Sequence, residues 1–175
     1  PEWLVNHGHR AFAWALAFAA RDDLRPDREL LYCACLLHDL GLVGAFFPAP
    51  GECFALSGAR GAVERLREAG MPADRARAVG EAIALHLNLV VAIDPHGVEA
   101  HLLRAGTAMD VVGQDAERIS TAFREQTLRE IPRLGFADAV VPAIAEQARR
   151  SPDTRIGLLC TRLGLIGRAK HAPLG

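Results

Sequence analysis

The sequence lacks an excess of charge of either sign, with 20 Lys and Arg residues against 21 Asp and Glu residues and a formal net charge of −1. A chain without net charge has no general electrostatic attraction to nucleic acid or to acidic membranes. The sequence also lacks any apolar run that approaches the ~18–20 residues of a membrane-spanning helix. We therefore expect a small molecule as the partner, and neither nucleic acid nor a membrane.

Lysine and paired cysteines are scarce as well. Lys170 is the one lysine, so arginine supplies nearly all of the positive charge, and arginine suits sites where two donors must hold an anion. The four cysteines lack the paired spacing of a zinc-binding motif. They are Cys33, Cys35, Cys53 and Cys160. We expect them to be reduced thiols in a cytoplasmic protein.

What the sequence does contain is a regular helical pattern. Apolar residues make up 50% of the 175 residues, which is enough to form the core of one globular domain. They recur at three- and four-residue steps, and no strand-like alternation persists. The chain begins at Pro1 without a Met, so we expect N-terminal sequence to be missing. The pattern predicts a single all-α domain over residues 1–175, a helical bundle with helices at about 2–21, 27–40, 57–69, 72–86, 98–112, 116–131, 136–149 and 154–165.

The chain is organised around residues 30–41, an almost wholly apolar stretch that ends in His38, Asp39 and then Gly41. It contains no Pro or β-branched residue, and Asp27 is well placed to cap the start of a buried helix. Gly41 suits the left-handed conformation that often ends a helix. Burying a carboxylate beside an imidazole is costly unless its charge is compensated, and a metal cation compensates it directly. A polar pair that caps the helix end is the plainer alternative.

Two further polar residues lie on or beside apolar helical faces. His7 lies within the apolar stripe of the first predicted helix, and Asp110 lies next to the stripe of the helix at 98–112. Each alone has a plainer explanation, as a hydrogen-bonded core histidine or as an aspartate that caps a helix or pairs with an arginine. Combined with His38 and Asp39, they indicate a divalent-metal site with room for water.

With these residues in place, the sequence resembles the HD superfamily of metal-dependent hydrolases. The superfamily pattern is a His on an early helix, a His-Asp pair at the end of a later helix and a distant Asp. The local context is most similar to the cyanamide hydratase-like branch. Five blocks in the same order carry the resemblance and span about residues 6–113: Asn6-His7-Gly8-His9-Arg10, Leu36-Leu37-His38-Asp39-Leu40-Gly41, Phe54-Ala55-Leu56-Ser57-Gly58-Ala59, Glu81-Ala82-Ile83-Ala84-Leu85-His86 and Asp110-Val111-Val112-Gly113.

The resemblance implies one divalent metal ion per chain, held by His7, His38, Asp39 and Asp110. Zinc is the first expectation, with iron or manganese as alternatives. Such an ion lowers the pKa of bound water, and Asp39 could accept the proton that the water loses. His86 lies on the inward face of its helix and could donate a proton or contact the substrate. A buried, hydrogen-bonded histidine is the alternative for His86.

Three more residues become candidates for substrate binding under the same resemblance. Asn6, beside the first ligand, could orient that ligand or the substrate. Arg10 follows one helical turn later, so it could meet an anionic substrate or neutralise Asp39. Phe54 and the aromatic residues of the loop before it could form an apolar lid, with plain core packing as the alternative.

The resemblance implies hydration or hydrolysis of a small uncharged molecule by metal-activated water, such as conversion of a nitrile-type group to an amide. A phosphohydrolase acting on a nucleotide or small phosphomonoester is the alternative, with Arg10, Arg60 and Arg104 as candidates to hold the anion. Two other hypotheses about function are kept. One is an oxygenase with two irons, for which His86 and His101 would be further ligands. The other is a helical ligand-binding module without enzymatic activity. The protein could form a homo-oligomer under any of these hypotheses.

Overall fold

The computed structural model describes residues 1–174, and every regular element within them is helical. The prediction of an all-α fold is therefore confirmed. No helix in this part of the chain is both long enough and apolar enough to cross a lipid bilayer. The α-helices are α1 (Glu2–Arg21), α2 (Arg28–Leu37), α3 (Phe54–Glu68), α4 (Ala73–Leu85), α5 (Ile93–His96), α6 (Val98–Val112), α7 (Thr121–Glu130), α8 (Phe136–Arg150), α9 (Arg155–Leu163) and α10 (Leu165–Lys170), and the 3-10 turns are η1 (Leu40–Leu42), η2 (Gly44–Phe46) and η3 (Ala116–Arg118).

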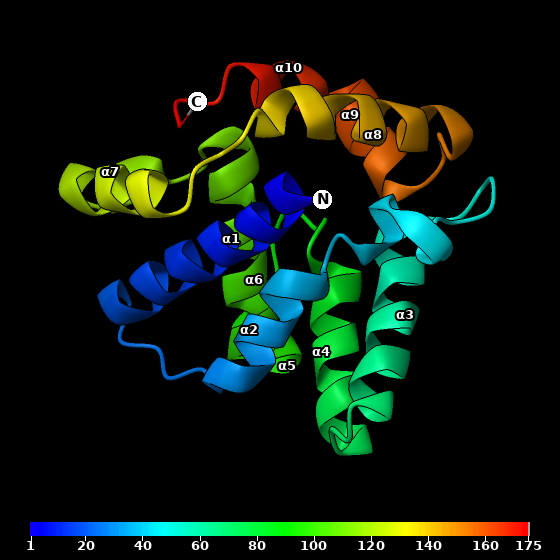
Figure 1. Cartoon of the computed structure of the whole chain (residues 1–175), viewed down its shortest axis with the longest axis horizontal. Helices are drawn as coiled ribbons and strands as arrows, with labels where there is room; N and C mark the ends of the chain where they lie inside the picture. The colour runs from blue at the N-terminus through cyan, green and yellow to red at the C-terminus, as the bar shows by residue number, and fades with distance from the viewer. Residues whose placement is uncertain (175) are drawn as a thin grey trace.

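The main core lies among α1, α2, α4 and α6. The helix α1 packs against both α2 and α6, and α3 pairs with α4 along one side of the bundle (Figure 1). Large side chains from these helices are fully buried, among them Trp14, Leu31, Ile83 and Leu102. Burying each such side chain contributes about 1.5–3 kcal/mol, so the periodic apolar stripes account for the assembly of the bundle.

A second layer, formed by α8, α9 and α10, extends across one end of the bundle (Figure 1, yellow to red). Its own apolar cluster includes Phe136, Val140 and Ile156, and it packs against Leu42 and Phe54 of the bundle. The layer therefore covers the end of the bundle at which α2 stops.

The helix α2 begins as predicted but ends differently. The Asp27 carboxylate accepts hydrogen bonds from the backbone N–H groups of Glu29 and Leu30, at 3.0 and 3.1 Å. The prediction for Gly41 was wrong, because Gly41 lies inside η1 and does not have a positive φ. A Cβ at this position would lie only 2.1 Å from the backbone oxygen of Phe54. Glycine is required there for the close approach of η1 to α3.

Three other predicted boundaries were wrong, each for a local reason. The helix α3 begins at Phe54, and the Ser57 hydroxyl donates to the Phe54 carbonyl inside the helix instead of capping it. The segment 116–131 is divided because Ser120 caps a new helix, α7. The last predicted helix is divided at Gly164, whose φ of 61° separates α9 from α10.

Candidate metal centre and pocket

Three buried side chains meet where α2 ends beside α1. Nε2 of His7 lies 3.1 Å from Nε2 of His38, and Oδ2 of Asp39 lies 3.6 and 3.3 Å from these two nitrogens. Bonds of about 2.0–2.1 Å to a tetrahedral zinc ion place the ligand atoms about 3.3 Å from one another. The three atoms therefore have the spacing of three ligands around one ion.

Close packing of α1 on α2 brings the two imidazoles together. A Cβ on Gly8, next to His7, would lie 2.9 Å from the backbone oxygen of Cys35 and 3.0 Å from Cα of Leu36. Real Cβ contacts are essentially never that short, so a larger residue would push the helices apart. Glycine at position 8 thus helps to set the distance between His7 and His38.

The second ring nitrogen of each imidazole near Asp39 is already hydrogen-bonded to an oxygen. Nδ1 of His7 lies 2.7 Å from Oδ2 of Asp110, and Nδ1 of His38 and of His86 lies 2.8 and 2.6 Å from the backbone oxygen three residues earlier. These oxygens can only accept, so each neutral ring carries its proton on Nδ1 and keeps a lone pair on Nε2. Lone pairs and a carboxylate then face one another without a hydrogen between them, an arrangement that a cation relieves.

The fourth predicted ligand, Asp110, lies behind His7 and not beside Asp39. Its Oδ1 accepts from Nε of Arg10 at 2.8 Å and from Nε1 of Trp14 at 2.9 Å. Its Oδ2 accepts from Nη2 of Arg10 at 2.8 Å and from Nδ1 of His7. Both oxygens are thus occupied by donors. In this position the carboxylate orients the His7 ring, as outer carboxylates commonly do for metal-binding histidines.

Burial disfavours the charged form of every titratable group in the cluster. The charges and hydrogen bonds of neighbouring groups then determine the direction in which each pKa is shifted. Burial lowers the pKa of His7, and burial together with the charge of His38 lowers the pKa of His86 to about 4. Burial would raise the pKa values of Asp39 and Asp110, but the basic groups beside them lower both well below the usual range. For His38, burial lowers the pKa but Asp39 raises it more. A proton on His38 and a cation between the groups are alternative ways to balance Asp39.

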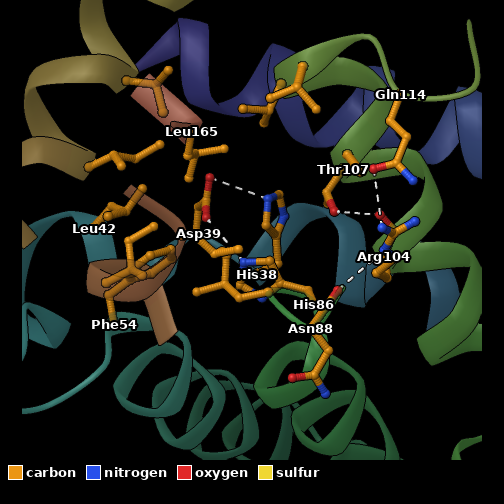
Figure 2. A pocket seen from close by; sticks show the side chains of 18 of the residues that line it. His38, Asp39, Leu42, Phe54, His86, Asn88, Arg104, Thr107, Gln114 and Leu165 are labelled. Carbon is orange, nitrogen blue, oxygen red and sulfur yellow. Dashed lines mark hydrogen bonds and ion pairs between the residues drawn. The ribbon is translucent and has the colours of Figure 1, made fainter. Parts of the chain in front are cut away.

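A cavity of about 100 Å³ opens in front of this cluster, between the bundle and the C-terminal layer (Figure 2). In the view of Figure 2, Arg104 and Gln114 lie at one side of the cavity, with His38, Asp39 and His86 in the middle. The walls are otherwise mainly apolar and include Leu42, Phe54, Leu87, Ala108, Val111, Val140, Ile144, Ile156, Leu159 and Leu165.

The structure brings some of the predicted substrate-binding residues to this cavity and leaves others outside. Phe54 lines the cavity, and its ring centroid lies 5.8 Å from that of His86. The Asn6 side chain donates instead to the backbone of the α7–α8 loop, at 2.9 Å. Arg10 is fully buried against Asp110, so it neutralises that carboxylate and neither meets a substrate nor neutralises Asp39. His101 binds a backbone oxygen through Nδ1 and is not among the residues that line the cavity.

The lid over the cavity differs from the predicted one. Phe46 packs beside Gly61, and Phe47 is partly exposed near the guanidinium of Arg150. These loop aromatics therefore lie outside the cavity, and α8 to α10 cover it instead. Trp14 was also missed as a donor to Asp110. Its position seven residues after His7, on the same helical face, was the available signal.

Comparison of the sequence with known proteins finds relatives of low sequence identity. No family model matches the sequence. The sequence is 28% identical over 155 residues to two proteins of Saccharomyces cerevisiae, Cyanamide hydratase DDI2 and Cyanamide hydratase DDI3. In each case the aligned region covers 85% of this chain and 67% of the yeast protein. The chain is thus weakly similar to these hydratases over most of its length.

Proposed function

We propose that this protein is a metal-dependent hydratase or hydrolase of the HD superfamily that adds water to a small, nitrile-type substrate. The observation that carries the proposal is the convergence of Nε2 lone pairs of His7, His38 and His86 on the Asp39 carboxylate, with every Nδ1 hydrogen-bonded elsewhere. The similarity to yeast cyanamide hydratases supports the same class of reaction.

His7, His38 and Asp39 would hold one divalent ion per chain, and the ring of His86 lies next to them. Imidazole nitrogens combined with a carboxylate suit zinc best, with iron or manganese as alternatives. A divalent ion held by these groups would lower the pKa of bound water and so would supply hydroxide near neutral pH.

Asp39 and His86 are placed to move the protons of the reaction. Oδ2 of Asp39 faces the two other imidazoles, whereas Oδ1 lies 3.9 Å from Nε2 of His86. A neutral His86 with a free Nε2 can receive, through Asp39, the proton that the attacking water loses. His86 then delivers this proton to the nitrile nitrogen as oxygen bonds to carbon. A shift of the remaining hydroxyl proton to nitrogen completes the amide, so that one water is added overall.

The size of the cavity bears on the choice between small substrates and nucleotides. An apolar cavity of about 150 Å³ binds benzene, so a cavity of about 100 Å³ suits a small molecule of only a few carbon atoms. A nucleotide is several times larger than benzene, so most of it would lie outside the cavity. Of the three arginines considered for phosphate binding, Arg10 is bonded to Asp110 and Arg60 is exposed and paired with Glu52, which leaves Arg104 as the candidate that lines the cavity. These observations favour a small substrate over a nucleotide.

The proposal is tested by metal analysis combined with a substrate panel of cyanamide, short nitriles and p-nitrophenyl phosphate. We expect about one divalent ion per chain and turnover of a nitrile-type compound, both lost in Asp39→Asn. Asp138→Asn, which changes an exposed carboxylate on α8, is the matched control and should retain both. Turnover of the phosphate ester alone would select the phosphohydrolase, and a metal-free protein without turnover would contradict the proposal.

A further inference from the structure

Arg104 on α6 is a half-buried cation that faces the cavity, and within residues 1–174 it forms no ion pair with a carboxylate. Its Nε donates to the backbone oxygen of Asn88 at 3.3 Å, and its Nη2 donates to Oε1 of Gln114 at 3.2 Å. Both acceptors are neutral, and both distances are at the long end for hydrogen bonds. Arg10, by comparison, makes two short hydrogen bonds to the Asp110 carboxylate.

The charges around Arg104 leave its positive charge only partly balanced. Burial lowers the pKa of the guanidinium, the charge of Asp115 opposes this effect, and the charge of Arg168 adds to it. Arg168 on α10 lines the same cavity from the opposite layer. Two arginines therefore border one small cavity, whereas Asp115 is not among the residues that line it. A partly desolvated guanidinium is costly without a counterion, and its planar fork matches the two oxygens of a carboxylate.

The position of Arg104 relative to the metal centre limits the length of a ligand that uses both. Arg104 and Gln114 lie at one side of the cavity, and His38, Asp39 and His86 lie nearer its middle (Figure 2). The total volume of about 100 Å³ suits a small molecule of only a few carbon atoms. The remaining walls are mainly apolar. The cavity thus suits a short apolar linker with a charged group at one end and a reactive group at the other.

We propose that the substrate carries a carboxylate, which Arg104 binds beside Gln114, while the group that receives water lies at the Asp39 cluster. A short aliphatic acid that bears a nitrile, such as 3-cyanopropionate, belongs to this class. The reactive end of this assignment rests on the proposed function above, whereas the carboxylate end rests on the surroundings of Arg104 alone. This substrate class differs from the uncharged molecule expected from the sequence.

Binding of butyrate tests the carboxylate end without any turnover. Isothermal titration of the metal-loaded protein should detect butyrate binding that weakens about tenfold or more in Arg104→Gln. The loss should be smaller in Arg104→Lys, because lysine keeps a charged hydrogen-bond donor. The affinity for butyramide, the neutral counterpart of butyrate, should be the same in Arg104→Gln as in the wild type. Arg129→Gln, on the exposed face of α7, is the matched control and should bind butyrate like the wild type. Thermal melts establish that each variant is folded.

Two results would overturn the assignment. One is that the wild type shows no measurable butyrate binding. The other is that the wild type and a folded Arg104→Gln variant bind butyrate equally, which would place butyrate on the metal ion. A kinetic comparison separates this failure from failure of the proposed function. Arg104→Gln should raise KM for 3-cyanopropionate about tenfold while KM for propionitrile stays unchanged. If neither nitrile is turned over but butyrate binding depends on Arg104, the proposed reaction fails and the carboxylate site stands.

Discussion

The two sides of the cavity are built in different ways. On the bundle side, Nδ1 of each of His7, His38 and His86 has a defined hydrogen-bond partner, and both oxygens of Asp110 accept from donors on α1. On the side of α8 to α10, apolar side chains such as Val140, Ile144 and Leu165 contribute mainly shape. A reaction centre requires fixed geometry, whereas an apolar wall tolerates substitutions that preserve volume. Metal binding is therefore expected to depend on the bundle side alone, whereas substrate binding should depend on the apolar wall of α8 to α10 as well as on Arg104 of the bundle.

The largest effect is expected on the bundle side, for His38→Ala. Removal of one ligand should reduce bound metal from about one ion per chain to near zero and abolish turnover. Elemental analysis of the purified, folded variant measures the bound metal, and the substrate panel measures turnover. His96→Ala, an exposed histidine of α5, should match the wild type in both. Full retention of metal in His38→Ala would contradict the assignment of the metal site to the bundle side of the cavity.

Asp110→Asn comes next and sharpens the role of the outer carboxylate. It leaves the buried guanidinium of Arg10 without its counterion, so we expect a loss of about 3–5 kcal/mol in the free energy of unfolding. Metal affinity should fall about 10–100-fold, as for other groups that orient a ligand. Denaturant unfolding and metal titration measure the two effects. Complete loss of metal, as in His38→Ala, would instead make Asp110 a direct ligand.

On the opposite side of the cavity, Ile144→Trp should separate binding from metal content. The larger ring enters the cavity, so KM for the substrate should rise about tenfold or more, at a cost of about 1–3 kcal/mol in stability from overpacking. The metal content should stay at about one ion per chain. A variant that is folded yet loses its metal would show that the C-terminal layer also holds the reaction centre.

The smallest effect is expected for Asp27→Ala, which removes the N-cap of α2 far from the cavity. The loss should be about 1 kcal/mol in the free energy of unfolding, with unchanged metal content. Hydrogen bonds from Arg75 and from the backbone N–H of Leu30 lower the pKa of Asp27 in the folded protein. The contribution of Asp27 is therefore present above its unfolded pKa of about 4 and is lost as the pH falls through the lower, folded value. Unfolding curves at pH 7 and pH 3 should show a difference between variant and wild type that shrinks at the lower pH.

The sequence predicted the bundle side better than the C-terminal layer, and the reason is physical. Apolar periodicity shows which helical face points inward, and it predicts the buried positions of His7 and His86. The almost wholly apolar run 30–41 predicts a buried helix that ends at His38. Periodicity does not show which buried polar groups touch one another. Asp110 was therefore paired with the metal, although Arg10 and Trp14 of α1 occupy its oxygens.

The C-terminal layer was not predictable in the same way. Its helices α8 and α9 were recognised from their own patterns. Their position over the cavity depends on residues far apart in the chain, because Phe136 and Ile156 share one apolar cluster with Leu42 and Phe54. Arg104 likewise looked like one arginine among many, because only the folded chain shows that it faces a cavity without a carboxylate partner in the part that the structure describes.

The most direct test of the metal centre is a crystal structure of the protein grown with zinc, measured at the zinc absorption edge. We predict one strong anomalous peak within about 2.0–2.2 Å of Nε2 of His7, Nε2 of His38 and a carboxylate oxygen of Asp39. Crystals grown under these conditions with no anomalous peak among these three residues would contradict the account.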